Sequence, residues 1–279
     1  MPTPAQALQN VLGRPHCGLG VFVPAGLYPP AAERRTLARL AAAGADLFEV
    51  GLPHHTPFLD GPVIRSAYRR VLDGGAVLDR TLHAVEHAAG HAPAVVMTYW
   101  EPVRRHGPER LARSLREAGA AGVMVVDLPD EEAGAWHRLT ATLGLTAPRL
   151  ALRTTPPRQL AAIAAHASGW LYAPASAAPT GYRGPLDVPA LAAAVRRLRR
   201  AGPLPVVSGV GISTPRRAAD VAPLVDAVVI GTPVVRALTQ GPCQAGELVA
   251  SFAHALRPTP RAYPAVHSPH RRVPQPAPS

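Results

Sequence analysis

The chain has 279 residues, 47% of them hydrophobic, which is enough for one large domain with its own core. Its formal charge of +11 comes from basic side chains that are all Arg and are scattered along the sequence, while only 5% of the residues are aromatic. A nucleic-acid-binding surface gathers basic and aromatic residues on one face. We therefore expect no nucleic-acid partner, and a solvated basic surface that attracts anionic substrates.

The sequence also bears on the cellular location. No apolar run approaches the ~18 residues that a transmembrane helix requires, and Met1–Asn10 lack the basic and then apolar pattern of a secretory signal. Cys17 and Cys243 have no CxxC or histidine-rich spacing around them. We expect a cytoplasmic protein with no membrane contact, no disulfide framework and no structural zinc.

Short apolar, β-prone runs alternate with Ala-, Leu- and Arg-rich segments of helical periodicity. This alternation predicts parallel strands joined by right-handed helical crossovers. Eight such units in ~250 residues predict a single-domain (β/α)₈ TIM barrel over residues 1–256. The predicted strands are 18–24, 46–50, 94–99, 122–126, 149–152, 170–173, 205–208 and 227–230. The predicted helices are 31–43, 62–72, 82–89, 109–118, 131–143, 156–166, 188–200 and 214–221.

Two flanking helices and a tail complete the predicted architecture. Residues 3–12 read as an amphipathic helix that covers the bottom of the barrel, and residues 244–256 as a closing helix. From 257 to 279 the chain is rich in Pro and Arg without a periodic apolar pattern, which predicts a disordered tail.

Two carboxylates lie at the C-terminal ends of the predicted strands, where the active sites of such barrels are found. Glu49 interrupts the apolar second strand, and Asp60 lies in the loop that follows it. Burial of a carboxylate is costly and raises its pKa, which suits it to proton transfer near neutral pH. We predict Glu49 and Asp60 as catalytic residues. The alternative is a core glutamate with a satisfied partner and an aspartate that only holds its Asp-Gly-Pro turn.

Glycines punctuate the loops after the last three strands. Thr180-Gly181 follows the sixth strand, Gly209-Val-Gly211 the seventh, and Gly231-Thr232 the eighth. In this fold, the loops after strands seven and eight and a helix N-terminus often bind phosphate. The sequence therefore predicts a phosphate site there.

These motifs, in this order and spacing from about Gly18 to Leu238, resemble the tryptophan synthase alpha chain family. The segments that carry the resemblance are Phe22-Val-Pro-Ala-Gly26, Glu49-Val-Gly-Leu-Pro53, Asp60-Gly-Pro-Val-Ile64, Met97-Thr-Tyr99, Val126-Asp-Leu-Pro129, Thr180-Gly181, Gly209-Val-Gly-Ile-Ser213 and Gly231-Thr232. The resemblance implies a lyase that cleaves indole-3-glycerol phosphate to indole and glyceraldehyde 3-phosphate without a metal or organic cofactor.

The resemblance also implies roles for individual residues. Glu49 is expected to be the general acid/base, and Asp60 to bind the indole N–H and stabilise positive charge on the ring. The residues expected around the substrate are Phe22, Met97, Tyr99, Val126, Tyr172 and Val210, with Asp127 in a layer behind them. The residues expected to bind the phosphate are Thr180, Gly181, Gly211, Gly231 and Thr232.

The sequence departs from the family in the loop between the two carboxylates and after the third strand. His54-His-Thr-Pro57 replaces the family's Phe-Ser-Asp-Pro, and Glu101-Pro102 replaces Asn-Pro. The family implies a tryptophan synthase beta chain as partner, and the altered loop at 54–57 argues against the usual contact with it. Two alternatives remain open: a stand-alone lyase or isomerase acting on another aryl or sugar phosphate, and a non-catalytic regulatory family member.

Overall fold

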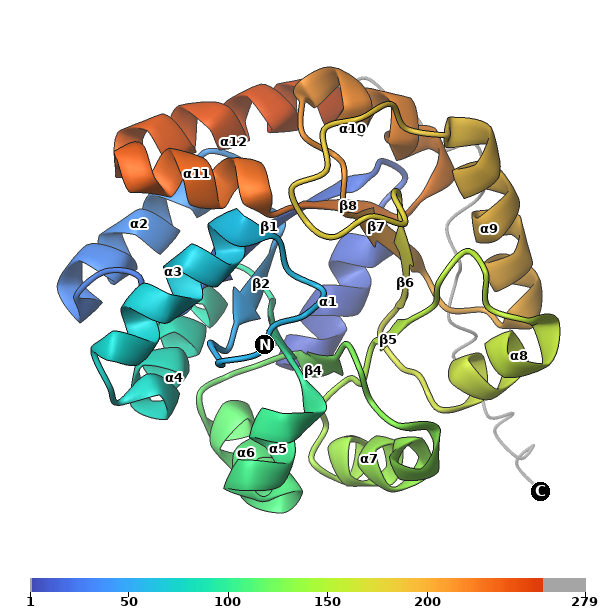
Figure 1. Cartoon of the computed structure of the whole chain (residues 1–279), viewed down its shortest axis with the longest axis horizontal. Coiled ribbons are helices and arrows are strands. Elements are labelled where there is room, and N and C mark those ends of the chain that lie inside the picture. The colour runs from blue at the N-terminus through green and yellow to red at the C-terminus, as the bar shows by residue number, and fades with distance from the viewer. Residues whose placement is uncertain (1, 258–279) are drawn as a thin grey trace, which may run out of the picture.

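Eight parallel strands form the centre of the molecule, with helices around them (Figure 1). The structure is a computed structural model that describes residues 2–257, so the predicted disordered tail lies, from residue 258 on, outside the described residues. The strands are β1 (Gly18–Pro24), β2 (Leu47–Gly51), β3 (Ala94–Thr98), β4 (Gly122–Val125), β5 (Arg149–Leu150), β6 (Leu171–Pro174), β7 (Val206–Gly209) and β8 (Ala227–Ile230).

The strands curl into a barrel. Their hydrogen-bonded order is β4-β3-β2-β1-β8-β7-β6-β5, which leaves β4 and β5 as the two ends of the sheet. Backbone bonds just before β5 join these ends: the Thr146 N–H donates to the Ala121 carbonyl, and the Val123 N–H donates to the Thr146 carbonyl, each at 2.9 Å. The predicted (β/α)₈ barrel is confirmed.

The helices pack against the outside of this barrel. They are α1 (Pro4–Leu12), α2 (Pro30–Ala42), α3 (Pro62–Asp73), α4 (Val77–Ala89), α5 (Trp100–His106), α6 (Pro108–Glu117), α7 (Asp130–Thr142), α8 (Pro157–Ala165), α9 (Val188–Ala201), α10 (Pro215–Val221), α11 (Thr232–Gln240) and α12 (Pro242–Leu256). Two of them, α5 and α11, were not predicted from the sequence. Within residues 2–257, no helix is long and apolar enough to cross a membrane.

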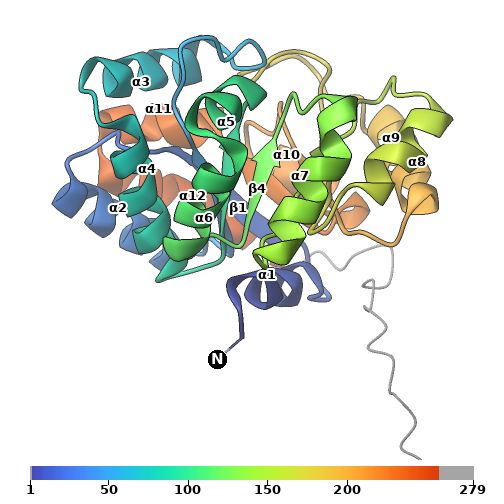
Figure 2. The same ribbon diagram turned by 90° about the horizontal axis from the view of Figure 1, so that it is seen from below.

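Helix α1 closes the end of the barrel from which the strands start, as predicted. Figure 2 shows it below the barrel, on the side opposite the loops that follow the strands. Its amphipathic face buries Leu8, Val11 and Leu12, which belong to the same hydrophobic cluster as residues of the barrel interior. Side chains of α1 and of the strands thus pack together at the lower end of the barrel.

The pleat of β2 aims Glu49 into the barrel. Leu47 belongs to the interior cluster, whereas Phe48 and Val50 pack with the outer cluster between strands and helices. Because side chains alternate along a strand, Glu49 faces the interior as Leu47 does, one step nearer the open end. The parallel register places Glu49 beside Phe22 of β1.

Candidate active site

A cavity of about 750 Å³ opens at the C-terminal ends of the strands. Most of its wall is apolar, with side chains from strands on all sides of the barrel and from the loops above them. Of the residues predicted for the site, the structure brings these to the cavity wall: Phe22, Glu49, Asp60, Met97, Tyr99, Val126, Tyr172, Thr180, Gly181, Val210, Gly211, Gly231 and Thr232.

Glu49 is a buried acid with little to stabilise its charge. It is 3% exposed, and its Oε1 atom has no hydrogen-bond partner among residues 2–257. Burial, and to a smaller extent the neighbouring Asp60 carboxylate, raise its pKa to about 8. Glu49 is therefore mostly protonated at pH 7, which allows it to donate a proton to a bound molecule.

Asp60 is also buried, at 2% exposed, but two hydroxyl groups hydrogen-bond to it. The Tyr99 hydroxyl donates to Oδ2 at 2.9 Å, and the Thr180 hydroxyl contacts Oδ1 at 3.4 Å. Burial raises the pKa of Asp60, these hydrogen bonds and Arg65 partly offset that rise, and the resulting pKa is about 6. Asp60 is consequently ionised at pH 7, when Glu49 is mostly neutral. The two carboxyl groups are thus suited to different tasks.

Close approach of two loops holds Asp60 in place. The Gly61 N–H donates to the Thr180 hydroxyl oxygen at 2.7 Å, and the Thr180 N–H donates to the Leu59 carbonyl at 3.3 Å. A Cβ atom on Gly61 would lie 1.9 Å from the Thr180 carbonyl oxygen, so only glycine fits there. The Asp-Gly-Pro motif therefore does more than form a turn: it lets the loop after β2 contact the loop after β6.

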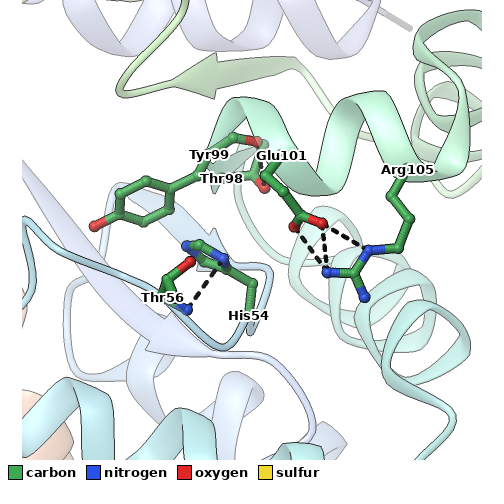
Figure 3. Close-up of polar contacts among 6 residues, drawn as sticks. All are labelled: His54, Thr56, Thr98, Tyr99, Glu101 and Arg105. Carbon is green, nitrogen blue, oxygen red and sulfur yellow. Dashed lines mark hydrogen bonds and ion pairs between the residues drawn. The ribbon is translucent and has the colours of Figure 1, made fainter.

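The altered loop at 54–57 supports Tyr99 from behind (Figure 3). The His54 ring packs on the Tyr99 ring with centroids 4.4 Å apart, and its Nδ1 atom accepts a hydrogen bond from the Thr56 N–H at 3.4 Å. Burial lowers the pKa of His54 to about 4, so the imidazole is neutral at pH 7. His54 is buried whereas His55 is exposed, and neither belongs to a group of three or more possible metal ligands within residues 2–257.

The glycine-rich loops meet at the start of α11. Gly231 is the residue before this helix, Thr232 is its first residue, and a Cβ atom on Gly181 would lie 3.5 Å from the Thr232 side chain. The first N–H groups of a helix have no intrahelical acceptor and, with the helix dipole, favour an anion. Val210, in the loop after β7, has φ 47°, a strained value for a β-branched residue. Such strain is often found at functional sites.

Asp127 is not on the cavity wall. Its Oδ1 atom accepts a hydrogen bond from the Trp100 N–H at 2.6 Å, at the start of α5. It therefore orients the segment that follows Tyr99 instead of facing the cavity.

Several cavity residues were not found from the sequence. Met124 could have been inferred from strand alternation, because it lies two residues before Val126. Arg183, Arg217 and Arg236 also line the cavity, on the side of the glycine-rich loops. No sequence motif distinguishes these three from the many other arginines.

The fold and this cavity define a class of protein, a (β/α)₈-barrel enzyme with two buried carboxyl groups above a mostly apolar cup. Comparison with known proteins agrees. The family model described as tryptophan synthase alpha chain matches residues 12–259. The tryptophan synthase alpha chain of Streptomyces avermitilis is 36% identical over 236 residues, which cover 84% of this chain and 85% of that protein. The alpha chain of Caulobacter is 38% identical over 221 residues, 78% of this chain and 80% of that protein.

Solved structures give the same result. A structure of Mycobacterium tuberculosis tryptophan synthase matches with a TM-score of 0.83 at 32% identity, over 91% of this chain and 98% of that one. The structure of the tryptophan synthase alpha subunit from Legionella pneumophila matches with a TM-score of 0.82 at 28% identity, over 93% of this chain and 100% of that one. The chain belongs to the tryptophan synthase alpha chain family. This is a family of carbon–carbon lyases that split indole-3-glycerol phosphate into indole and glyceraldehyde 3-phosphate.

Proposed function

We propose that this chain cleaves indole-3-glycerol phosphate in the cavity above the barrel, with Glu49 and Asp60 as the catalytic groups. The single observation that carries this proposal is the placement of two buried carboxyl groups on the wall of one mostly apolar cavity; burial raises the pKa of both, that of Glu49 further than that of Asp60. A retro-aldol cleavage of this substrate needs one group that moves a proton and one that balances charge.

Asp60 is the group that balances charge. Its carboxylate accepts a hydrogen bond from the indole N–H and stabilises the positive charge that develops on the ring when C3 is protonated. The Tyr99 and Thr180 hydroxyl groups fix its orientation. Apolar side chains around it, among them Phe22 and Met97, provide the surface for the indole ring.

Glu49 is the group that moves the proton. In its neutral form it protonates C3 of the indole, and the resulting carboxylate takes the proton from the glycerol hydroxyl as the carbon–carbon bond breaks. The electron pair of that bond returns to the indole ring and the hydroxyl carbon becomes the aldehyde, so Glu49 ends in its starting state. A pKa of about 8 suits both directions of this transfer.

The phosphate end of the substrate is assigned to the glycine-rich loops. We place the phosphate against the backbone N–H groups at Gly181, Gly211, Gly231 and Thr232, at the N-terminus of α11. The arginines on the same side of the cavity supply a positive field that favours the dianion.

We also propose a tryptophan synthase beta chain as the partner, docking at the mouth of the cavity. Phe58, in the loop after β2, is 57% exposed and is one of two exposed large hydrophobic residues in the described part of the chain. Within residues 2–257, neither Cys17 nor Cys243 is part of a disulfide, which supports the proposal of a reducing cytoplasmic location.

The test is a product assay. Purified protein is incubated with indole-3-glycerol phosphate, with and without an added beta chain, and indole and glyceraldehyde 3-phosphate are measured separately. We expect the two products in equal amounts, and on the order of 10²-fold less of each from Asp60→Asn. Turnover of other aryl or sugar phosphates in place of this substrate would favour the stand-alone alternative. No turnover of any phosphate would favour the regulatory one.

A further inference from the structure

The loop between β6 and α9, residues 175–187, covers the cavity, and we refer to it as the lid loop. Its residues from Ser176 to Arg183 all lie on the cavity wall. At one point the lid loop is fixed by the contacts of Thr180 with the loop after β2, described above. A second attachment lies farther along the lid loop, on the side of α10.

This second attachment is a single side chain, Arg217, in the first turn of α10. Its Nη1 atom donates to the Gly211 carbonyl at 3.1 Å and to the Ser213 hydroxyl oxygen at 3.0 Å, both in the loop after β7. Its Nη2 atom donates to the carbonyls of Arg183 and Gly184 in the lid loop, at 2.9 and 2.8 Å. One planar guanidinium group therefore joins the lid loop to the loop after β7.

The two loops that Arg217 joins are also packed tightly together. Gly211 has φ +93°, and a Cβ atom on it would lie 2.9 Å from Leu186 and 3.1 Å from the Cβ of Ser176, both in the lid loop. Arg217 thus bridges the lid loop and the loop after β7 at a point where the two are in close contact. A change in the position of the lid loop would change the position of Gly211, which we assign to phosphate binding.

Arg217 forms no ion pair within residues 2–257. Its hydrogen-bond acceptors are carbonyl and hydroxyl oxygens, and no carboxylate in this described part of the chain forms a salt bridge with it. Arg217 itself lines the cavity. It therefore brings an uncompensated positive charge to the end of the cavity where the phosphate is placed.

We propose that Arg217 is a positioning residue that fastens the lid loop to the loop after β7, and so keeps Thr180 against Asp60 while Gly181 and Gly211 face the phosphate together. The inference rests on the proposed function for its catalytic consequence, but the fastening itself does not depend on the identity of the substrate. Lysine in place of Arg217 would keep the charge and lose the fork that reaches both loops.

Limited trypsin digestion tests the fastening directly, because Arg217 holds the carbonyl of the Arg183–Gly184 peptide bond, which is a tryptic site. The variants are Arg217→Gln and Arg217→Lys, and the matched control is Arg216→Gln, its exposed neighbour on the same helix. Cleavage after Arg183 is measured by mass spectrometry relative to cleavage at all other sites. We expect this ratio to rise about tenfold or more in both Arg217 variants, as for loss of a hydrogen bond to a charged group, and to stay unchanged in the control.

Two outcomes of the digestion would overturn the fastening. One is a wild-type ratio in both Arg217 variants. The other is a general rise in cleavage at every site without a change in the ratio, since that would show a loss of overall stability and no specific release of the lid loop.

Kinetics with indole-3-glycerol phosphate separates position from charge. If Arg217 positions the lid loop, Arg217→Lys and Arg217→Gln both raise KM and lower kcat, with kcat/KM reduced by up to about 10²-fold, as for a misplaced binding group. Wild-type kinetics in Arg217→Lys would show that charge alone matters and would overturn the positioning role. An inactive wild-type protein would overturn the proposed function instead, and the digestion would still decide on the fastening.

Discussion

Replacing Glu49 by Gln is predicted to stabilise the folded protein at alkaline pH while it removes activity. In the folded protein the pKa of Glu49 is about 8, compared with 4.5 for an exposed glutamate. Between these two pH values the folded state holds a proton that the unfolded state has released, so the stability of the wild type falls as the pH rises through this window. At ~1.36 kcal/mol per pKa unit, the full difference amounts to ~5 kcal/mol as an upper bound. Glutamine does not titrate and loses none of this stability.

The assay is urea unfolding of the wild type and Glu49→Gln at several pH values from 4.5 to 8.5. The free energy of unfolding of Glu49→Gln minus that of the wild type is expected to grow with pH by a few kcal/mol. Glu117→Gln, at an exposed position on α6, serves as the control and should show no such trend. Parallel stability curves for Glu49→Gln and the wild type would refute the reasoning, because they would mean that Glu49 ionises normally in the folded protein.

Three further predictions concern the surroundings of Asp60. Tyr99→Phe removes a hydrogen bond that lowers the pKa of Asp60, so we expect the pKa of Asp60 to rise. The acid limb of the profile of kcat/KM against pH should then move to higher pH. An unmoved limb would contradict this. Gly61→Ala places a Cβ atom against the Thr180 carbonyl and should destabilise the fold by about 1–3 kcal/mol and lower kcat/KM, whereas unchanged thermal unfolding and kinetics would count against the loop contact. His54→Phe keeps the ring that packs on Tyr99 and should leave kcat near that of the wild type, while His54→Ala should lower it; equal effects of the two changes would show that the ring is not what matters.

The strands and the catalytic candidates could be predicted because burial leaves a clear sequence pattern. Parallel strands that are buried on both faces appear as continuous apolar runs, and such runs marked the positions of β1 to β8. Glu49 was identified because it interrupts one of these runs. The strand β5 is only two residues long, although four were predicted, and Leu152, at the end of the predicted strand, is 51% exposed.

The two helices that were missed depend on distant contacts. The first N–H group of α5 bonds to Asp127, 27 residues farther along the chain, a contact that cannot be read from the segment near Trp100. The local signals of α5, Glu101 in its first turn and Arg105 in its last turn, paired at 2.7 Å, were overlooked. In α11, Thr232, Val234 and Val235 are β-branched and disfavour a helix locally. Burial of Val234 and Val235 against the barrel overrides that preference. Propensity alone therefore underestimates helices that are short and well packed.

The role of individual arginines could not be predicted either. The sequence shows them as scattered basic residues, which predicts a solvated surface. Arg217 differs because its partners, the carbonyls of Arg183 and Gly184, lie 34 and 33 residues away along the chain. Such a bridge becomes visible only when the fold brings the lid loop beside α10.

Proton transfer by Glu49 is the central step of the proposed reaction, and one pair of measurements tests it directly. The rate of indole release from indole-3-glycerol phosphate is measured for the wild type and Glu49→Gln, together with the dissociation constant of each protein for glycerol 3-phosphate as an unreactive phosphate ligand. We expect kcat to fall on the order of 10²-fold or more, with the dissociation constant unchanged. A variant that binds glycerol 3-phosphate and still releases indole at the wild-type rate would contradict the central claim.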